Sequence, residues 1–184
     1  MIVFRNHPCE VINHLNGDRY TLESVADIDP SQIQVERITS ICNEPAVFSM
    51  LFSEMFPEGR YPESAAREFL NWVTDGWQQG THFVFATLDS DGLVVSTCDI
   101  KSDNIEEAEI GYLCSSAHSG VMTNSVKAMT GLGIKAGFEN FFALVRVDNI
   151  ASQRVLERVG FHRDEEFPQG SNRFRYMATR KSIL

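Results

Sequence analysis

The sequence has little of what marks membrane, secreted or nucleic-acid-binding proteins. Its longest unbroken apolar stretch toward the C-terminal end covers residues 141–145, whereas a membrane-spanning helix needs about 20 apolar residues. The N-terminus lacks the sustained apolar segment of a signal peptide. Basic residues are outnumbered, with 16 Lys and Arg against 25 Asp and Glu and a formal net charge of −9. Because phosphate backbones bind basic surfaces, we expect neither a membrane nor a nucleic acid as partner.

Paired metal and disulfide motifs are also missing. The four cysteines are scattered without a CxxC pair, and the five histidines show neither HxH nor HxxxH spacing. Structural zinc sites and disulfide frameworks usually show such spacings. We therefore expect no metal site, and a reduced, cytoplasmic protein whose thiols pack as small apolar groups.

What is present is an ordinary globular composition. The chain has 184 residues, of which 43% are hydrophobic and 22% charged, which argues against a disordered, collagen-like or coiled-coil chain. A chain of this length buries enough apolar surface for a core without disulfides. No internal repeat, low-complexity tract or linker divides it. We therefore predict a single domain over residues 1–184.

The N-terminal part of the chain is predicted to be mainly helical. Residues 1–18 are polar and rich in turn formers, and residues 19–25 alternate as a first strand. Asp29, Pro30 and Ser31 are typical of a helix start, since Asp caps a helix and Pro is tolerated in its first turn. Apolar spacing predicts three helices, over residues 29–41, 46–55 and 62–80.

From residue 82 the hydrophobic period changes from helical to alternating. Residues 82–88 and 93–100 alternate on either side of a tight turn at 89–92, which is a strong hairpin signal. A third strand follows at 108–114. The remaining segments are a helix over 120–138, a strand over 141–147 that we expect to be buried on both faces, a helix ending at Val159, and terminal strands near 161–167 and 173–179. This order predicts an α+β (mixed α/β) fold with a strand–helix–strand crossover in its second half.

Three motifs in residues 108–162 carry the functional signal. They are AEIGY at residues 108–112, GVMT at 120–123 and VDNIASQRVLERVGF at 147–161. In this order and spacing the chain resembles the GNAT superfamily of acyl-CoA-dependent N-acetyltransferases, in particular the ribosomal-protein N-terminal acetyltransferase branch. The resemblance implies a central, mostly antiparallel twisted sheet flanked by helices. It also implies transfer of an acetyl group from acetyl-CoA to a primary amine, by direct attack while both substrates are bound.

The GVMT segment is the expected phosphate site. A loop that feeds a helix N-terminus presents free backbone N–H groups and the positive end of the helix dipole, which suit a pyrophosphate. We expect Gly120 to permit close approach, and Val121, Met122 and Thr123 to supply donors. In the family this loop reads Gln/Arg-x-x-Gly-x-Gly/Ala. Here the matching positions hold Ala117, Gly120 and Met122, so only the central glycine is kept; an ordinary helix start is the alternative.

The second cofactor segment is the start of the following helix. By itself, Asn149 is a favoured N-cap and Ser152 an unremarkable first-turn residue. In similar GNAT proteins the matching Asn binds the pantetheine arm and the Ser lies near the thioester sulfur. Leu156 stands where many members carry the tyrosine that protonates the leaving thiolate, so Ser152 is the available substitute. Arg154 would reach the cofactor or form an exposed salt bridge.

Two residues of the third strand complete the predicted site. An amine must lose its proton before attacking a thioester, and its free pKa is about 10, so Glu109 is a candidate general base acting through water. It would otherwise anchor the substrate ammonium group or lie on the surface. A backbone N–H near Leu113 is expected to stabilise the oxyanion. A covalent route through Cys114 and His118 is disfavoured, because buried thiols are usually inert.

Two other classes of protein stay open at this stage. The departures at Ala117 and Met122 are compatible with a CoA-binding regulatory protein that has lost turnover. The helical N-terminal third is compatible with a structural or interaction module. The acceptor is left open between a protein N-terminus, a polyamine and an amino sugar, and a homodimer is compatible with the sequence.

Overall fold

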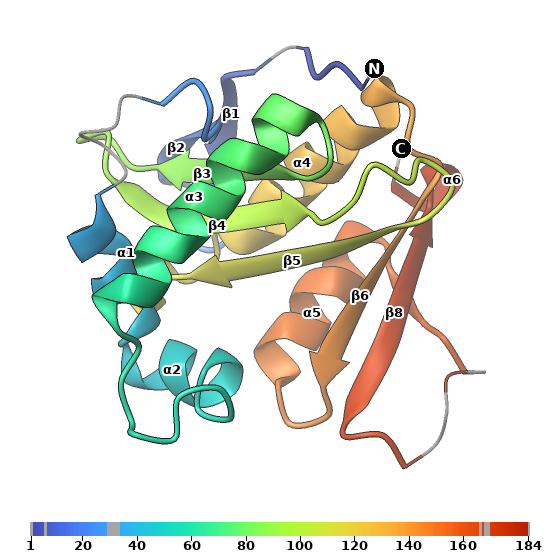
Figure 1. The fold of residues 1–184 in the computed structure, drawn as a ribbon. Coiled ribbons are helices and arrows are strands. Elements are labelled where there is room, and N and C mark those ends of the chain that lie inside the picture. The colour runs from blue at the N-terminus through green and yellow to red at the C-terminus, as the bar shows by residue number, and fades with distance from the viewer. Residues whose placement is uncertain (1, 6, 29–33, 166, 168–169, 184) are drawn as a thin grey trace.

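The computed structural model describes residues 2–5, 7–28, 34–165, 167 and 170–183. Eight strands form one sheet in the order β1-β2-β3-β4-β5-β6-β8-β7 (Figure 1). All neighbours are antiparallel except β5 and β6, which are parallel. This confirms the predicted mixed α/β class with a mostly antiparallel sheet. The strands are β1 (Cys9–Ile12), β2 (Arg19–Ser24), β3 (Phe83–Leu88), β4 (Val94–Ile100), β5 (Ala108–Cys114), β6 (Asn140–Arg146), β7 (His162–Arg163) and β8 (Arg173–Thr179).

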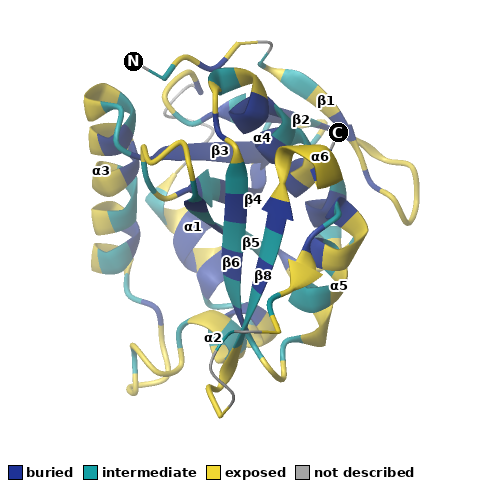
Figure 2. Cartoon of the chain, turned by 90° about the vertical axis from the view of Figure 1, so that its right-hand side faces the viewer, coloured by how far each residue is buried: buried dark blue, intermediate teal, exposed yellow. Residues whose placement is uncertain are grey.

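The helices form a layer on each side of the sheet. In Figure 1 α3 crosses in front of the strands and α4 lies behind them, and Figure 2 shows α3 and α5 on opposite sides. The side of α1 and α3 buries Ile38, Ala66 and Val94, and the side of α4 and α5 buries Phe85, Met129 and Leu156. The helices are α1 (Val35–Cys42), α2 (Pro45–Leu51), α3 (Glu63–Gln79), α4 (Met122–Ala136), α5 (Ile150–Val159) and α6 (Arg180–Ile183), with a short 3₁₀ turn at Ser116–His118.

The crossover helix α4 approaches the sheet closely. A Cβ added at Gly133 would lie 2.8 Å from Phe141 Cζ and 3.0 Å from Ile100 Cδ1. The glycine therefore serves packing within a continuous helix, although isolated helical glycines are unfavourable by themselves. Gly137, with a φ of 115°, ends the helix in the left-handed conformation.

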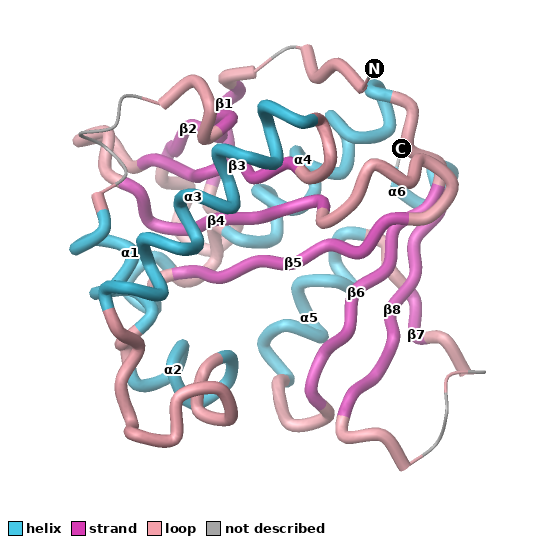
Figure 3. The backbone as a smooth tube through the Cα atoms, in the orientation of Figure 1, coloured by secondary structure: helices cyan, strands magenta, loops and turns pink. Residues whose placement is uncertain are grey.

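The parallel strands β5 and β6 diverge, and this divergence positions the site. They pair only at Ala108 with Phe141 and at Glu109 with Phe142. Beyond these pairs β6 follows β8 along its whole length and leaves β5 (Figure 3). The open end of the fork lies at Cys114, where the chain leads into α4, and at Arg146, where it leads into α5.

Several predicted elements differ from the structure. Residues 9–12 form the unexpected strand β1, because a turn-rich sequence there closes a hairpin with β2. The helix start predicted at residues 29–31 lies outside the described residues, and α1 begins at Val35. Helix α2 ends at Leu51. The predicted strand at 161–167 is short: β7 covers His162–Arg163, and the Asp164 N–H adds a hydrogen bond to the Arg175 carbonyl of β8 at 2.8 Å.

The prediction that β6 is buried on both faces is wrong. Its burial alternates, with Phe141, Ala143 and Val145 buried and the residues between them half-buried. The reason is that helices cover β6 on the side of α4 and α5, whereas Phe142 on the other side is covered by the Arg175 guanidinium, 4.6 Å from its ring centroid.

Candidate active site

A cavity of about 540 Å³ lies at the open end of the fork between β5 and β6. Its walls come from α2, from the end of β5 and the loop after it, from the first turns of α4 and α5, and from the β1–β2 turn. The N-termini of two helices therefore face one cavity, which is the arrangement expected for an anionic or amide-rich ligand. The predicted site residues that line it are Leu113, Gly120, Met122, Thr123, Asn149, Ser152 and Arg154.

The start of α4 carries unpaired donors. Within the described residues, no hydrogen bond occupies the backbone N–H of Gly120, Met122 or Thr123. The Thr123 hydroxyl is buried without a partner in the same part of the structure, although the residue lines the cavity. A buried polar atom without a partner is rare and is normally satisfied by water or ligand. These donors fit a phosphate group.

Val121 does not take the role predicted for it. Its side chain is fully buried, it is absent from the cavity wall, and its N–H donates to the carbonyl of His118 at 3.3 Å. The sequence placed it among the free donors because the helix start was expected at Gly120. The helix begins at Met122 instead, so Val121 is the N-cap and already inside a turn.

At the start of α5, Asn149 caps the helix and also lines the cavity. The Asn149 side chain caps the helix by accepting from the Ser152 N–H at 3.1 Å, and both residues line the cavity. The Tyr112 hydroxyl lies 2.6 Å from Ser152 Oγ and donates to the Ser152 carbonyl at 3.1 Å. Tyr112 therefore reaches from β5 to the residue predicted to face the thioester.

Tyr112 lines the cavity, and the sequence analysis did not predict a functional role for it. Burial raises the pKa of its phenol, and the hydrogen bond to Ser152 opposes that shift only in part. The phenol is therefore protonated throughout the physiological range and is available as a donor. Its alternation with Ile110 and Ala108 correctly placed it on one face of β5. The contact of Tyr112 with α5 could not be predicted from the sequence, because the contact depends on the divergence of β6 from β5.

The register of β5 assigns its backbone donors. Lys101 N–H donates to Glu109 O and Ser115 N–H donates to Val95 O, each at 2.9 Å, with an unbroken antiparallel register between these pairs. Along an antiparallel ladder, hydrogen-bonded pairs alternate with pairs that are not hydrogen-bonded. By this alternation Leu113 and Thr97 form a hydrogen-bonded pair. The N–H of Leu113 therefore points to β4, and the N–H of the adjacent Cys114 points toward the open fork, so Cys114 offers the donor near Leu113.

Cys114 and His118 do not form a nucleophile–base pair. Burial, with the nearby Glu44 charge, raises the pKa of the Cys114 thiol to about 12, so it stays neutral. The thiol donates to the Ser115 carbonyl at 3.3 Å, and the His118 Nδ1 bonds the Tyr20 hydroxyl at 3.0 Å. The geometry agrees with the interpretation of Cys114 as an inert thiol.

Glu109 lies outside the cavity wall, near the closed end of the fork. Leu113 is four positions further along β5, which is about 13 Å along a strand. Its carboxylate is paired with Lys101 Nζ at 2.5 Å and is partly exposed. The structure therefore does not bring Glu109 directly against the cofactor residues, and its predicted action would require intervening water.

Asp99 lies beside this ion pair on β4, opposite Gly111. Burial raises the pKa of Asp99 to about 6; Lys101 opposes the shift and Glu109 adds to it. Its Oδ2 is buried with no hydrogen-bond partner among the described residues. A carboxyl group that titrates near neutrality is typical of functional sites. The sequence analysis missed Asp99, because only the strand register reveals its position.

Two arginines of α5 give the cavity its positive charge. Arg154 and Arg158 are separated by one helical turn and both line the cavity. No ion pair is formed by either residue in the described part of the chain. The alternative interpretation of Arg154 as a salt-bridge residue therefore finds no support within these residues, and Arg158 is an addition to the predicted set.

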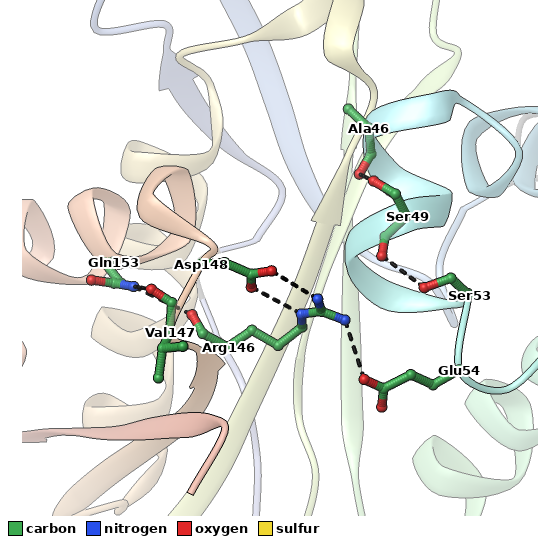
Figure 4. Close-up of polar contacts among 8 residues, drawn as sticks. All are labelled: Ala46, Ser49, Ser53, Glu54, Arg146, Val147, Asp148 and Gln153. Atoms are coloured by element: carbon green, nitrogen blue, oxygen red, sulfur yellow. Dashed lines mark hydrogen bonds and ion pairs between the residues drawn. The ribbon is translucent and has the colours of Figure 1, made fainter. Parts of the chain in front are cut away.

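An ion-pair bridge links α2 to the start of α5 (Figure 4). The Arg146 guanidinium donates to Asp148 at 2.8 Å and 3.0 Å and to Glu54 at 3.3 Å. Arg146 ends β6 and Glu54 follows α2, whose Met50 and Leu51 line the cavity. The bridge therefore holds one cavity wall against another.

Neither a metal cluster nor a membrane helix occurs in the described ranges. No group of three or more His, Cys, Asp or Glu side chains is arranged there to hold an ion. None of the helices in those ranges combines the length and apolarity needed to cross a bilayer.

A family model and several solved structures are similar to this chain. The model of the acetyltransferase (GNAT) domain family matches residues 28–162. The GNAT domain of S. lividans PAT is similar in structure, with a TM-score of 0.71 and 16% sequence identity over 96% of this chain and 99% of that chain. A search of curated protein sequences finds no match.

Two ribosomal-type acetyltransferases are also similar in structure. The ribosomal α-N-protein acetyltransferase RimL, solved in complex with coenzyme A, has a TM-score of 0.69 and 17% identity, covering 93% of this chain and 98% of its own. Mycobacterium smegmatis RimJ, solved in complex with CoA-disulfide, has a TM-score of 0.67 and 16% identity, covering 96% and 90%. At such identities the likeness establishes the fold.

Proposed function

The chain belongs to the GNAT family of acyl-CoA-dependent N-acetyltransferases, and on this premise we propose that it transfers an acetyl group from acetyl-CoA to a primary amine. The observation that carries the proposal is the single cavity lined by the N-terminal turns of both α4 and α5. One turn offers unpaired N–H groups for phosphate, and the other offers Asn149 and Ser152 for the amide-rich arm and the thioester. RimL is solved in complex with coenzyme A and RimJ with CoA-disulfide, which supports the same ligand class here.

Binding is assigned to residues of the cavity wall. The N–H groups of Gly120, Met122 and Thr123, with the Thr123 hydroxyl, would hold the diphosphate. Asn149 would bind the pantetheine arm, and Arg154 would add charge near the phosphates. Ala117 stands where the family has an amide or basic side chain, so one phosphate contact of the family is missing. The remaining contacts must supply the affinity for acetyl-CoA.

Acetyl-CoA supplies the activated acetyl group, and the chain supplies orientation and proton transfer. The Cys114 N–H, which points toward the fork, would donate to the thioester oxygen. The Ser152 hydroxyl would donate toward the sulfur of the leaving thiolate, with the Tyr112 O–H turned from the Ser152 carbonyl to Ser152 Oγ as its donor. Because Leu156 replaces the tyrosine common at this helix position, the Tyr112–Ser152 pair takes over that role.

Proton removal from the acceptor amine is assigned to the Asp99–Lys101–Glu109 group. Glu109 would accept the proton through water, because a carboxylate at the fork is the residue type that general-base catalysis needs. Lys101 is paired with that carboxylate, and Asp99 stands beside it as a second acceptor. A primary amine, from a protein N-terminus or a small molecule, is the acceptor class that this chemistry serves.

The test is turnover with acetyl-CoA and a panel of amines. Release of free CoA thiol is followed with N-terminal peptides, polyamines and amino sugars as acceptors. We expect at least one acceptor class to be acetylated, and we expect Glu109→Gln to lower the rate by about 10²–10⁴ while the acetyl-CoA affinity changes by less than about threefold.

Other outcomes would replace the proposal. Binding of acetyl-CoA without turnover of any amine would favour the alternative of a CoA-binding regulatory or interaction protein. A raised Michaelis constant with an unchanged turnover number in Glu109→Gln would make Glu109 an anchor for the substrate ammonium group.

A further inference from the structure

The turn between β1 and β2 docks on the loop that precedes α4. Asn13 Nδ2 donates to the Ser119 carbonyl at 3.1 Å, and the His14 N–H donates to the Gly120 carbonyl at 3.3 Å. From the other side, Asn124 Nδ2 donates to the Ile12 carbonyl at 2.6 Å. These three bonds join segments more than a hundred residues apart, so the turn is a fixed part of the cavity wall.

The hydrogen bonding of His14 determines which ring nitrogen is free. Its Nδ1 lies 2.5 Å from the carbonyl oxygen of Gly120. A carbonyl oxygen only accepts, so Nδ1 carries a hydrogen. In the neutral ring Nε2 is then a bare acceptor, whereas in the imidazolium it becomes an N–H donor with positive charge. The ring lines the cavity together with Thr123, whose hydroxyl is buried and unpartnered among the described residues.

We infer that His14 is a phosphate ligand for the CoA moiety and binds it as an imidazolium through Nε2. This rests on the proposed function. His14 reaches the phosphate-side loop from a different part of the chain, and it supplies the positive donor that is missing at Ala117. The Gly120 carbonyl orients the His14 ring, because this oxygen accepts a hydrogen bond and so requires a hydrogen on Nδ1.

Binding in this form couples to proton uptake by one group. The other charged groups of the cavity wall are Arg154 and Arg158 of α5, which stay protonated. Cys114 of β5 stays a neutral thiol, because burial raises its pKa to about 12. On the turn itself, Asp18 accepts from the Asn16 side chain at 2.7 Å. His14 is therefore the residue of the cavity wall to which the inference assigns the proton taken up with the phosphate.

The test compares the full-length wild type with His14→Gln by calorimetry. The ligands are acetyl-CoA, 3′-dephospho-CoA and pantetheine, and His162→Gln on the exposed strand β7 is the control. Charge-assisted hydrogen bonds contribute about 1.5–3 kcal/mol, so we expect His14→Gln to weaken acetyl-CoA binding by about tenfold or more. Pantetheine, which has no phosphate, should bind both proteins equally.

The 3′-dephospho ligand identifies the phosphate involved. If the tenfold loss persists with 3′-dephospho-CoA, His14 binds the diphosphate; if the loss disappears, His14 binds the 3′-phosphate. Either result supports the inference. Repeating the titration in buffers of different ionisation enthalpy measures proton uptake, which should be present in the wild type and lost in His14→Gln.

Two results would overturn the inference in distinguishable ways. Equal acetyl-CoA affinity and equal proton uptake in wild type and His14→Gln would remove His14 from the site and leave the proposed function standing. Absence of binding to the wild type would reject the proposed function itself and the inference with it. A cooperative thermal transition in each variant establishes that the comparison is between folded proteins.

Discussion

The hydroxyl of Tyr112 lies 2.6 Å from the hydroxyl of Ser152 and thereby joins the end of β5 to the first turn of α5. The two residues are 40 positions apart, and between them the chain forms α4 and β6. This contact bridges β5 and α5 at the wall of the cavity. It also places two hydroxyl groups in series where a leaving thiolate needs a proton donor.

The Tyr112–Ser152 pair predicts a separation between binding and chemistry. Ser152→Ala removes the nearer donor and should lower the turnover number by about 10- to 100-fold, the lower part of the range for acid–base catalysis. The acetyl-CoA dissociation constant should stay within about threefold. Tyr112→Phe should lower turnover less and cost about 1 kcal/mol of stability, because one buried hydrogen bond is lost. Steady-state kinetics measures the turnover number, and calorimetry measures the dissociation constant. Unchanged turnover in Ser152→Ala would contradict the role of Ser152 as proton donor.

Asp99 predicts a specific pH dependence of stability. Its pKa is raised from 3.8 to about 6 in the folded protein by burial. The folded state therefore holds this proton to higher pH than the unfolded state, so the free energy of unfolding contributed by Asp99 falls as pH rises from about 4 to about 6. Urea unfolding should show Asp99→Asn gaining about 1–3 kcal/mol over wild type between pH 4 and pH 7. The exposed Asp103→Asn is the control, and a pH-independent difference would contradict the assignment.

The Arg146 bridge predicts local rather than global loosening. Arg146→Met removes the ion pairs to Glu54 and Asp148, so the segment 45–54 should exchange amide hydrogens faster while the core strands keep their protection. Arg67→Met, which removes an exposed pair with Glu63 at 3.9 Å outside the cavity, is the matched control. Hydrogen-exchange mass spectrometry measures the difference. Equal amide hydrogen exchange in residues 45–54 of the wild type, Arg146→Met and Arg67→Met would show that the Arg146 bridge does not stabilise this segment.

The alternating burial of β6 predicts opposite outcomes at adjacent positions. Phe141 is fully buried against Gly133 and Phe138, so Phe141→Ala should destabilise the fold by about 3–5 kcal/mol. Phe142 lies under the Arg175 guanidinium, so Phe142→Asp gains a cationic neighbour and should remain soluble and cooperatively folded. Urea denaturation of both variants tests the pattern; loss of folding in Phe142→Asp would restore the prediction of burial on both faces.

The sequence predicted the hairpin β3–β4, the strand β5 and the long helices α3 and α4 because each has a clear hydrophobic period and an obvious boundary. It predicted the α5 N-cap because Asn149 has a local role that needs no tertiary context. It failed at β1, whose four residues form a strand only by pairing with β2. It also failed at Val121, since the first residue of a helix is not fixed by periodicity.

The sequence predicted only those parts of the site that lie in short local motifs. Gly120, Thr123, Asn149 and Ser152 lie together as expected, because each follows a strand at the same end of the sheet. Tyr112 and Asp99 were missed, and the donor expected near Leu113 could not be assigned to a single residue. Their roles depend on strand register and on the divergence of β6 from β5, neither of which is encoded in a short sequence window.

The most direct test of the account is calorimetric titration of the purified chain with acetyl-CoA. We predict saturable one-to-one binding at the start of α4, with a free energy of unfolding raised by about 2.7 kcal/mol at 100 times the dissociation constant. Gly120→Glu should abolish it, because a side chain there meets Asn13 and Leu15 and carries negative charge into the phosphate site, whereas Gly59→Ala in the loop before α3 should bind like wild type. No heat of binding and an unmoved melting temperature at millimolar acetyl-CoA would contradict the central claim.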